Sequence, residues 1–319
     1  MTTSAEKMRA WRGPAILSYG FRPFFLFGAI WAALAMVLWL LMLTGAYGLP
    51  TAFDPVSWHA HEFLFGYLGA VLGGFLLTAV PNWTGRLPMV GWPLAGLMAL
   101  WIAGRLAVSV SAALPRGWVM ALDLAYPLAL ALVLAREIIA GKNWKNLAVL
   151  LLVLAMALGN ALFHIEAAQG GYPAAGIGMR LGLGVAVMLI SVIGGRIVPS
   201  FTRNWLVQRR NPALPVPFGR ADGLVLLVTL VTLGVWVIWP AQVITAGLCA
   251  VAGLAQFWRL SRWSGRQTGS EALVWVLHVG YAFVPLGFLA MAAGLLLPGM
   301  GPAAQHIWMA GAVGLMTLA

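Results

Sequence analysis

Residues 24–43 read FFLFGAIWAALAMVLWLLML, a run of twenty positions without one charged side chain. As an α-helix rising 1.5 Å per residue, this run is about 30 Å long, which matches the hydrocarbon core of a bilayer. A helix satisfies its own backbone hydrogen bonds, which lipid cannot do. Nine similar runs follow, so the sequence predicts an all-α transmembrane helical bundle of about ten spans: Phe24–Leu43, Ala60–Val80, Pro93–Ala113, Trp118–Ala140, Leu147–Phe163, Leu181–Pro199, Gly223–Trp239, Gln242–Trp258, Leu273–Leu296 and Ala303–Ala319.

The composition agrees with an integral membrane protein and excludes other classes. Hydrophobic residues make up 62% of the chain and charged residues 8%, against roughly 25% charged in soluble domains. The net charge of +11 does not indicate a nucleic acid partner, because the basic residues lie in short loops between apolar runs. Cys249 is the only cysteine, so disulfides within the chain, covalent haem attachment and iron–sulfur clusters on cysteine are excluded. Any haem would be held mainly by histidine.

The basic residues also predict the orientation of the chain. With a cytoplasmic N-terminus, all the basic residues except Arg105, Arg116 and Arg180 fall in cytoplasmic loops or at helix ends. The last run ends at Ala319 without a polar tail, and the motifs GGFLLTAVPNWT (73–84) and GGRIVPSFT (194–202) recur four helices apart. Both features favour a twelve-helix protein, of which residues 1–319 form one helical domain lacking its C-terminal part.

Four of the five histidines share one expected depth. His59 and His61 open the second run, His164 follows the fifth and His306 lies near the start of the tenth, all at the outer face. His278 instead lies about 10 Å from the inner edge of the ninth run. A single interfacial histidine is commonly a hydrogen-bonding side chain, but four at one depth indicate metal ligands, because imidazole binds iron and copper. All five are therefore candidate ligands.

Helix geometry separates His59 from His61. Residues two apart point about 200° apart, whereas residues three or four apart share a face. His59 and His61 therefore serve different partners, or the chain is still extended at His59. Glu62 can share a face with His59 and is a further candidate ligand, and Asn160 can share one with His164.

Arg105 and Asp123 are charges inside apolar runs. Their expected depths differ by only about 5 Å, which an arginine side chain can reach. The favoured interpretation is an ion pair that makes two costly charges tolerable. The alternative is that Arg105 faces haem propionates.

Six motifs together resemble the NnrS family: YGFRPFFLFGAIWAAL (19–34), WHAHEFLFG (58–66), GFLLTAVPNWTGR (74–86), LWIAGR (100–105), GGRIVPSFTRN (194–204) and LHVGYAFVPLGF (277–288). The resemblance covers nearly the whole chain. It implies a multi-pass protein of the bacterial inner membrane with twelve helices, haem b and copper, linked to nitric oxide metabolism, nitrosative stress and denitrification. It assigns no histidine to either metal.

A fold-level analogy points to one pair of haem ligands. Catalytic subunits of haem–copper oxidases also have twelve helices, and histidines on helices two and ten hold a haem. His61 and His306 lie on helices two and ten here, so we expect them to be the axial pair. In the alternative interpretation of Arg105, this residue would bind the propionates of the same haem. His59 and His164 are then copper candidates. Unlike those subunits, this chain has no histidine in its sixth run.

The leading hypothesis is a haem- and copper-binding membrane protein that binds, senses or turns over nitric oxide. A multi-pass transporter is an alternative, but it would place charged residues and broken helices near mid-membrane. A redox subunit related to the oxidases and a structural subunit are further alternatives. The sequence shows no electron donor, so it leaves open whether the chain is an enzyme. The expected partners are nitric oxide or a related small ligand and membrane lipid.

Overall fold

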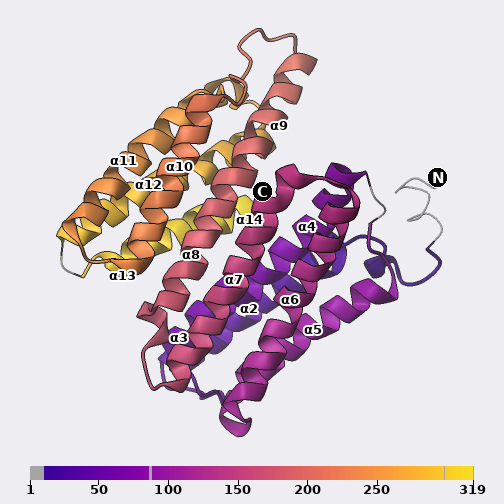
Figure 1. Cartoon of the computed structure of the whole chain (residues 1–319), viewed down its shortest axis with the longest axis vertical. Coiled ribbons are helices and arrows are strands. Elements are labelled where there is room, and N and C mark those ends of the chain that lie inside the picture. Colours follow the sequence, from indigo (N-terminus) through magenta and orange to yellow (C-terminus); the bar gives the residue numbers. More distant parts are fainter. Residues whose placement is uncertain (1–10, 86–87, 298, 319) are drawn as a thin grey trace. The chain divides into compact units, whose positions relative to one another are not determined.

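The computed structural model describes residues 11–85, 88–297 and 299–318, and the regular structure in these ranges is helical throughout. Nine helices in these ranges are long and apolar enough to cross a membrane, which confirms the predicted all-α multi-pass bundle. The chain divides into two compact units, Met1–Gly182 and Leu183–Ala319, and the second carries the orange and yellow helices of Figure 1. The expectation of a single membrane domain stays a prediction.

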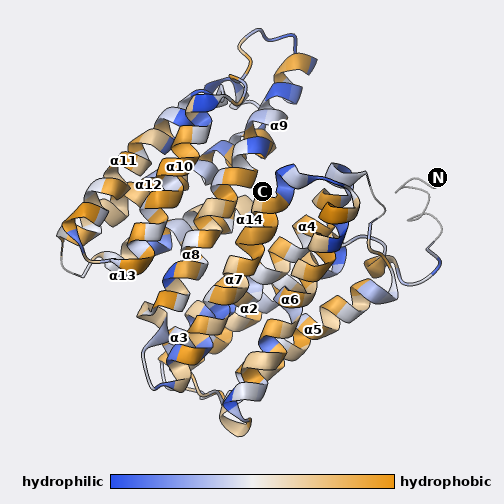
Figure 2. Ribbon diagram, viewed as in Figure 1, coloured by the Kyte–Doolittle hydropathy of each residue, from blue (hydrophilic) through white to orange (hydrophobic). Residues whose placement is uncertain are grey.

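Unit 1 contains five membrane-length segments. They are α2 (Phe21–Leu43), a second segment that joins α3 (Pro55–His61), a π-helical stretch (Glu62–Tyr67) and α4 (Leu68–Thr84), and then α5 (Trp92–Ser109), α6 (Arg116–Ala140) and α7 (Leu147–Ala168). Helix α2 packs on α4, and α6 packs on both α5 and α7. The second segment is central, because 72% of its most apolar window is buried, against 11% for α2. Figure 2 shows hydrophobic residues along the helices and hydrophilic ones mainly at helix ends and connections.

The second segment begins at Pro55, earlier than the predicted start at Ala60. Asp54 caps this end, because its carboxylate accepts hydrogen bonds from two backbone amides of the first turn, both at 3.0 Å. Proline suits the first helical position, which has no hydrogen-bonding partner for an amide. The cap makes both His59 and His61 helical, so the alternative of an extended chain at His59 is excluded.

Unit 2 holds the remaining segments. They are the sixth segment, which joins α8 (Ile177–Leu189, starting in unit 1), a π-helical stretch (Ile190–Gly194) and α9 (Gly195–Gln208), and then α10 (Arg220–Ile238), α11 (Val243–Ser261), α12 (Ala272–Leu296), α13 (Gly301–His306), a π-helical stretch (Ile307–Gly314) and α14 (Leu315–Leu318). Helix α11 packs on α10 and α12. The tenth predicted run is helical over residues 301–318 but is not among the nine candidate spans. Its glycine, proline, glutamine and histidine residues lower the mean hydropathy of this run.

The π-helical stretches in the described residues lie in the second, sixth and tenth segments, four helices apart. His61 and His306 each directly precede such a stretch. Both histidines also begin the pattern His-x-aromatic-x-x-Gly-x-x-Gly, as HEFLFGYLG at 61–69 and HIWMAGAVG at 306–314. Local structure and sequence therefore repeat together at these two histidines.

Candidate metal site

A cluster of buried ionisable and polar side chains lies within unit 1, on the second segment and helices α5, α6 and α7. We call it the Arg105 cluster, and it consists of His61, Glu62, Arg105, Asp123, Asn160 and His164. Every member is at most 7% exposed. Burial of this many polar groups in an apolar bundle is costly unless they satisfy one another.

Arg105 joins the two acidic residues of the cluster. Its Nη1 donates to Glu62 Oε1 at 2.7 Å, and its Nη2 donates to Asp123 Oδ1. The predicted ion pair of Arg105 and Asp123 is therefore confirmed, and the structure adds Glu62 to it. Arg105 Nε is buried without a hydrogen-bond partner among the described residues. The contact of Arg105 with haem propionates stays a prediction.

His61 lies between the two carboxylates. Its Nδ1 is 3.0 Å from Glu62 Oε1, and its Nε2 is 2.9 Å from Asn160 Oδ1 and 3.1 Å from Asp123 Oδ2. Carboxylate and amide oxygens only accept hydrogen bonds, so Nδ1 donates to Glu62, and Nε2 donates to Asn160 and Asp123 unless a metal takes the place of its hydrogen. A histidine held at one ring nitrogen in this way presents the other nitrogen as a metal ligand.

Helix α7 contributes two side chains that reach Asp123. His164 Nε2 lies 2.9 Å from Asp123 Oδ2, and Asn160 Nδ2 donates to the same oxygen at 2.8 Å. The shared face predicted for Asn160 and His164 is confirmed. One ligand atom each of His61, Asp123 and His164 lies within 4.8 Å of the other two. Two imidazoles and a carboxylate form a donor set that suits copper, zinc or iron.

Gly66 allows the close approach of Arg105 to the second segment. A Cβ atom at this position would lie 2.5 Å from Arg105 Nη1 and 3.0 Å from Glu62 Oε2. The carbonyl of Gly66, inside the π-helical stretch, accepts the indole hydrogen of Trp101 at 3.0 Å. Trp31 of α2 donates to Glu62 Oε2 at 2.7 Å. One indole therefore contacts the backbone of the π-helical stretch and another contacts its Glu62 side chain. π-Helical turns are frequent at functional sites.

The charges of the Arg105 cluster do not balance without a further cation. Glu62 and Asp123 carry two negative charges, and Arg105 carries one positive charge. With neutral histidines, the cluster holds one uncompensated negative charge in an apolar bundle, which is costly. A proton on His61 or a metal cation at the three ligand atoms would supply the missing charge.

Two of the predicted outer ligands come together and a third does not join them. The rings of His61 and His164 lie with centroids 5.1 Å apart. His59 stacks on Trp39 of α2 with centroids 4.1 Å apart, which agrees with the predicted divergence of His59 and His61. Asp123 is the ligand candidate that the sequence reasoning missed, although its expected depth near the outer histidines was a usable signal.

The two histidines of unit 2 have other surroundings. His278 is 8% exposed, and its Nε2 lies 2.8 Å from the Thr202 hydroxyl. His306 is exposed, and its Nδ1 lies 2.7 Å from the carbonyl oxygen of Pro302. A carbonyl only accepts, so Nδ1 of His306 donates, and Nε2 is the nitrogen that the predicted metal binding would use. Metal binding by His278 and His306 stays a prediction.

A second buried polar cluster lies in unit 2 and was missed from the sequence. We call it the Arg259 cluster, and it consists of Ser191, Asp222, Gln256, Arg259, Arg262 and Tyr281. Arg259 Nη1 donates to the Ser191 carbonyl at 2.8 Å and to Tyr281 Oη at 3.0 Å. The Tyr281 hydroxyl in turn donates to Gln256 Oε1 at 2.7 Å.

Two guanidinium groups in this cluster share one carboxylate. Arg259 Nε lies 3.4 Å from Asp222 Oδ1, and Arg262 Nη1 lies 3.1 Å from Asp222 Oδ2. The sequence reasoning counted both arginines as basic residues flanking a span. The three-residue spacing of Gln256 and Arg259, which places two polar side chains on one helical face, was the signal that could have found the cluster.

The family model described as NnrS protein matches residues 15–319, which include every residue of both clusters. The chain belongs to the NnrS family. This NnrS match confirms the resemblance that the six sequence motifs carry. No curated protein and no solved structure matches the chain significantly. NnrS membership and the buried His61, Asp123 and His164 group together support a metal-related function.

Proposed function

We propose that this chain is a metal-binding membrane protein that binds nitric oxide, with His61, Asp123 and His164 as the ligands of a copper ion. One observation carries the proposal: three donor groups lie buried together. With neutral histidines, the cluster around them has one uncompensated negative charge, which a metal cation would balance. The nitric oxide ligand and the choice of copper rest on the NnrS family. Two imidazoles and one carboxylate are compatible with copper.

The residues around the three donors fit such an ion. Glu62 accepts from Nδ1 of His61 and so orients its ring, in the manner of carboxylates behind metal-bound histidines. Asn160 contacts both His61 and Asp123 and so fixes the position of one relative to the other. When bound, copper would supply positive charge and a coordination position for a diatomic ligand. The surrounding apolar helices would let this small uncharged molecule arrive through lipid.

We also propose that His306 is a ligand of haem b, while the expected pairing of His61 with His306 stays a prediction. Two observations support His306 as a ligand: the sequence pattern and π-helical stretch that it shares with His61, and the hydrogen bond that orients its ring on the Pro302 carbonyl. The Nε2 atom of His61 can bind one metal only, so the copper site and the expected haem pairing exclude each other at His61. His164 belongs to the copper proposal alone and His306 to the haem proposal alone, so variants of these two separate them.

The experiment uses the full chain, purified in detergent, with metal analysis for copper and iron and a visible spectrum for haem. His164→Gln should lose copper and keep haem, and His306→Gln should lose the six-coordinate haem spectrum and keep copper. His61→Gln then shows which metal His61 holds. His59→Gln and His278→Gln are the matched controls and should keep both.

The outcomes that overturn each proposal are distinct. Copper content unchanged in both the His61 and the His164 variants rejects the copper site. A six-coordinate haem spectrum retained in the His306 variant rejects the haem ligand. Copper protein that gives no spectral or magnetic response to added nitric oxide rejects nitric oxide binding at that metal.

The cytoplasmic N-terminus and inner-membrane location are part of the proposal. Single cysteines at Ala113 and Ala213, introduced after replacement of Cys249, test the orientation. Ala113 should react with an impermeant reagent in intact cells, and Ala213 should react only after the membrane is opened. Labelling of Ala213 from outside would reverse the assignment.

A further inference from the structure

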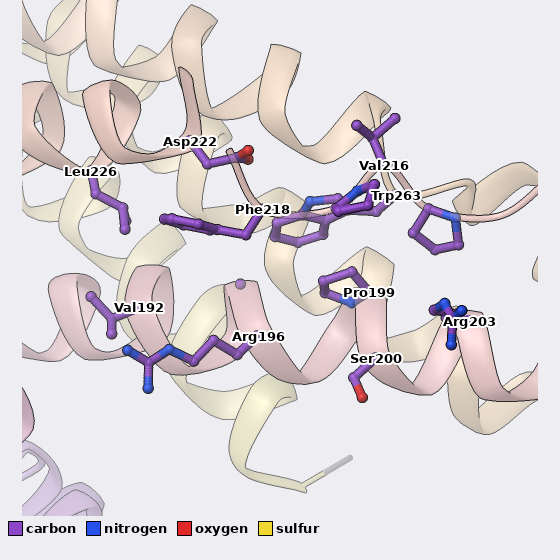
Figure 3. A pocket seen from close by; sticks show the side chains of 13 residues that line it. Val192, Arg196, Pro199, Ser200, Arg203, Val216, Phe218, Asp222, Leu226 and Trp263 are labelled. Carbon is purple, nitrogen blue, oxygen red and sulfur yellow. The ribbon is translucent and has the colours of Figure 1, made fainter. Parts of the chain in front are cut away.

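A cavity of about 500 Å³ opens beside the Arg259 cluster in unit 2. Figure 3 shows its two walls. Helix α9 and the turn before it form one wall, with Arg196 and Arg203, while the segment at residues 215–218, the start of α10 and Trp263 form the other. Asp222 of the Arg259 cluster also lines the cavity.

The cavity carries a surplus of positive charge. Arg196 and Arg203 are seven residues apart on α9, so they lie on one face, about 10 Å apart along the axis. The carboxylate of Asp222 on the opposite wall is already shared by Arg259 and Arg262. The single acidic group at the cavity is therefore more than neutralised by its own partners, and the two arginines of α9 add further positive charge.

The rest of the lining is apolar except for Ser200. Val192 and Leu226 lie at one end of the cavity in Figure 3, and Phe218 and Trp263 lie on the wall opposite α9. A free phosphate ion has nothing to contact on such surfaces. A molecule with a phosphate at one part and hydrocarbon at another would satisfy both the arginines and the apolar wall.

We propose that this cavity binds the phosphate head group of an anionic membrane phospholipid. One guanidinium group can donate two parallel hydrogen bonds to phosphate oxygens. Basic pockets between membrane helices bind anionic lipid head groups. The Arg196 side chain extends along α9 toward Val192 in Figure 3, so it would turn toward Arg203 for both to contact the phosphate. The wall of Phe218 and Trp263 would cover the glycerol and the first methylene groups. This inference is independent of the metal proposal.

The test is native mass spectrometry of the full chain with phosphatidylglycerol or phosphatidylcholine added. The chain should retain phosphatidylglycerol and not phosphatidylcholine. Each arginine near an anionic surface contributes about 1 kcal/mol, so Arg196→Gln with Arg203→Gln should weaken retention about 30-fold. Arg209→Gln with Arg210→Gln removes the same charge from exposed positions that do not line the cavity, and should keep the lipid.

Size-exclusion elution and helical content confirm that each variant is folded. If the double variant does not fold, each single variant should weaken retention about fivefold. Equal retention of the two lipids, or equal losses in the double variant and its control, would overturn the proposal. Complete displacement of the lipid by inorganic phosphate would identify free phosphate as the ligand and also overturn it.

Discussion

The Arg105 cluster of unit 1 and the Arg259 cluster of unit 2 share one plan and differ in the sign of their charge. Each has an arginine buried in membrane-length helices and an aspartate that contacts it. In unit 1 a second carboxylate, Glu62, and two histidines complete the group. In unit 2 a second guanidinium, Arg262, and uncharged polar groups complete it.

The difference teaches what each cluster can accept. A buried group with one negative charge too many is a site for a cation, and the imidazoles of unit 1 make that cation a metal or a proton. A group with surplus positive charge beside an open cavity is a site for an anion. Four substitutions test this contrast, in order of decreasing expected effect.

Arg105→Gln is expected to have the largest effect. It leaves Glu62 and Asp123 buried without their guanidinium, and breaking a buried pair costs about 3–5 kcal/mol. The yield of monodisperse protein and the thermal unfolding midpoint in detergent should both fall sharply. Adding Glu62→Gln should recover part of the loss, because it removes one unpaired carboxylate. A single variant as stable as the parent would contradict the charge imbalance of unit 1.

Arg259→Gln should cost less, because Arg262 still contacts Asp222. The variant loses hydrogen bonds to the Ser191 carbonyl and to Tyr281, a loss of about 1–3 kcal/mol. The same unfolding assay measures it. Damage equal to that of Arg105→Gln would mean that unit 2 has no surplus positive charge.

Gly66→Ala tests the close approach of Arg105. The new methyl group would collide with Nη1 of the arginine, and overpacking of this kind costs about 1–3 kcal/mol. Gly69→Ala is the matched control one turn away, where the nearest side-chain atom, on Tyr126, is 3.9 Å from the added carbon. The control should unfold at the same temperature as the parent. Equal effects of both changes would contradict the conclusion that Gly66 is needed for the close approach of Arg105.

Thr202→Val should have the smallest effect. It removes the hydroxyl that contacts His278, a loss of about 0.5–1.5 kcal/mol, and should leave copper and haem contents unchanged. The assay is metal analysis beside the unfolding midpoint. Loss of metal in this variant would contradict the proposed metal site in unit 1 and assign it to unit 2.

The sequence could predict the depth of a side chain but not the direction in which it points. Depth follows from counting residues along a helix, so the meeting of His61 with His164, and of Arg105 with Asp123, could be expected. Direction depends on how neighbouring helices pack. Glu62 was therefore grouped with His59 by spacing, while in the structure it contacts His61 and Arg105.

Two further features could be predicted only in part from spacing. The π-helical stretch after His61 could not be predicted from HEFLFGYLG alone, which reads as an ordinary apolar helix, because the pattern that it shares with residues 306–314 gains meaning only once both stretches are seen. Arg259 stands near the end of a span, where a basic residue is expected to reach the interface. Its side chain is instead 1% exposed, because Asp222 and Tyr281 on neighbouring helices receive it.

The π-helical stretch Glu62–Tyr67 can also be understood at the level of the gene. Such a stretch holds one residue more than an α-helix closing the same turns, so it corresponds to a single codon. Deleting that codon would restore a regular helix and rotate everything before it by about 100° relative to α4. His61 and Glu62 would then turn away from Arg105 while every hydrophobic residue of α4 kept its place. One codon therefore separates a helix that carries the cluster from one that only spans the membrane.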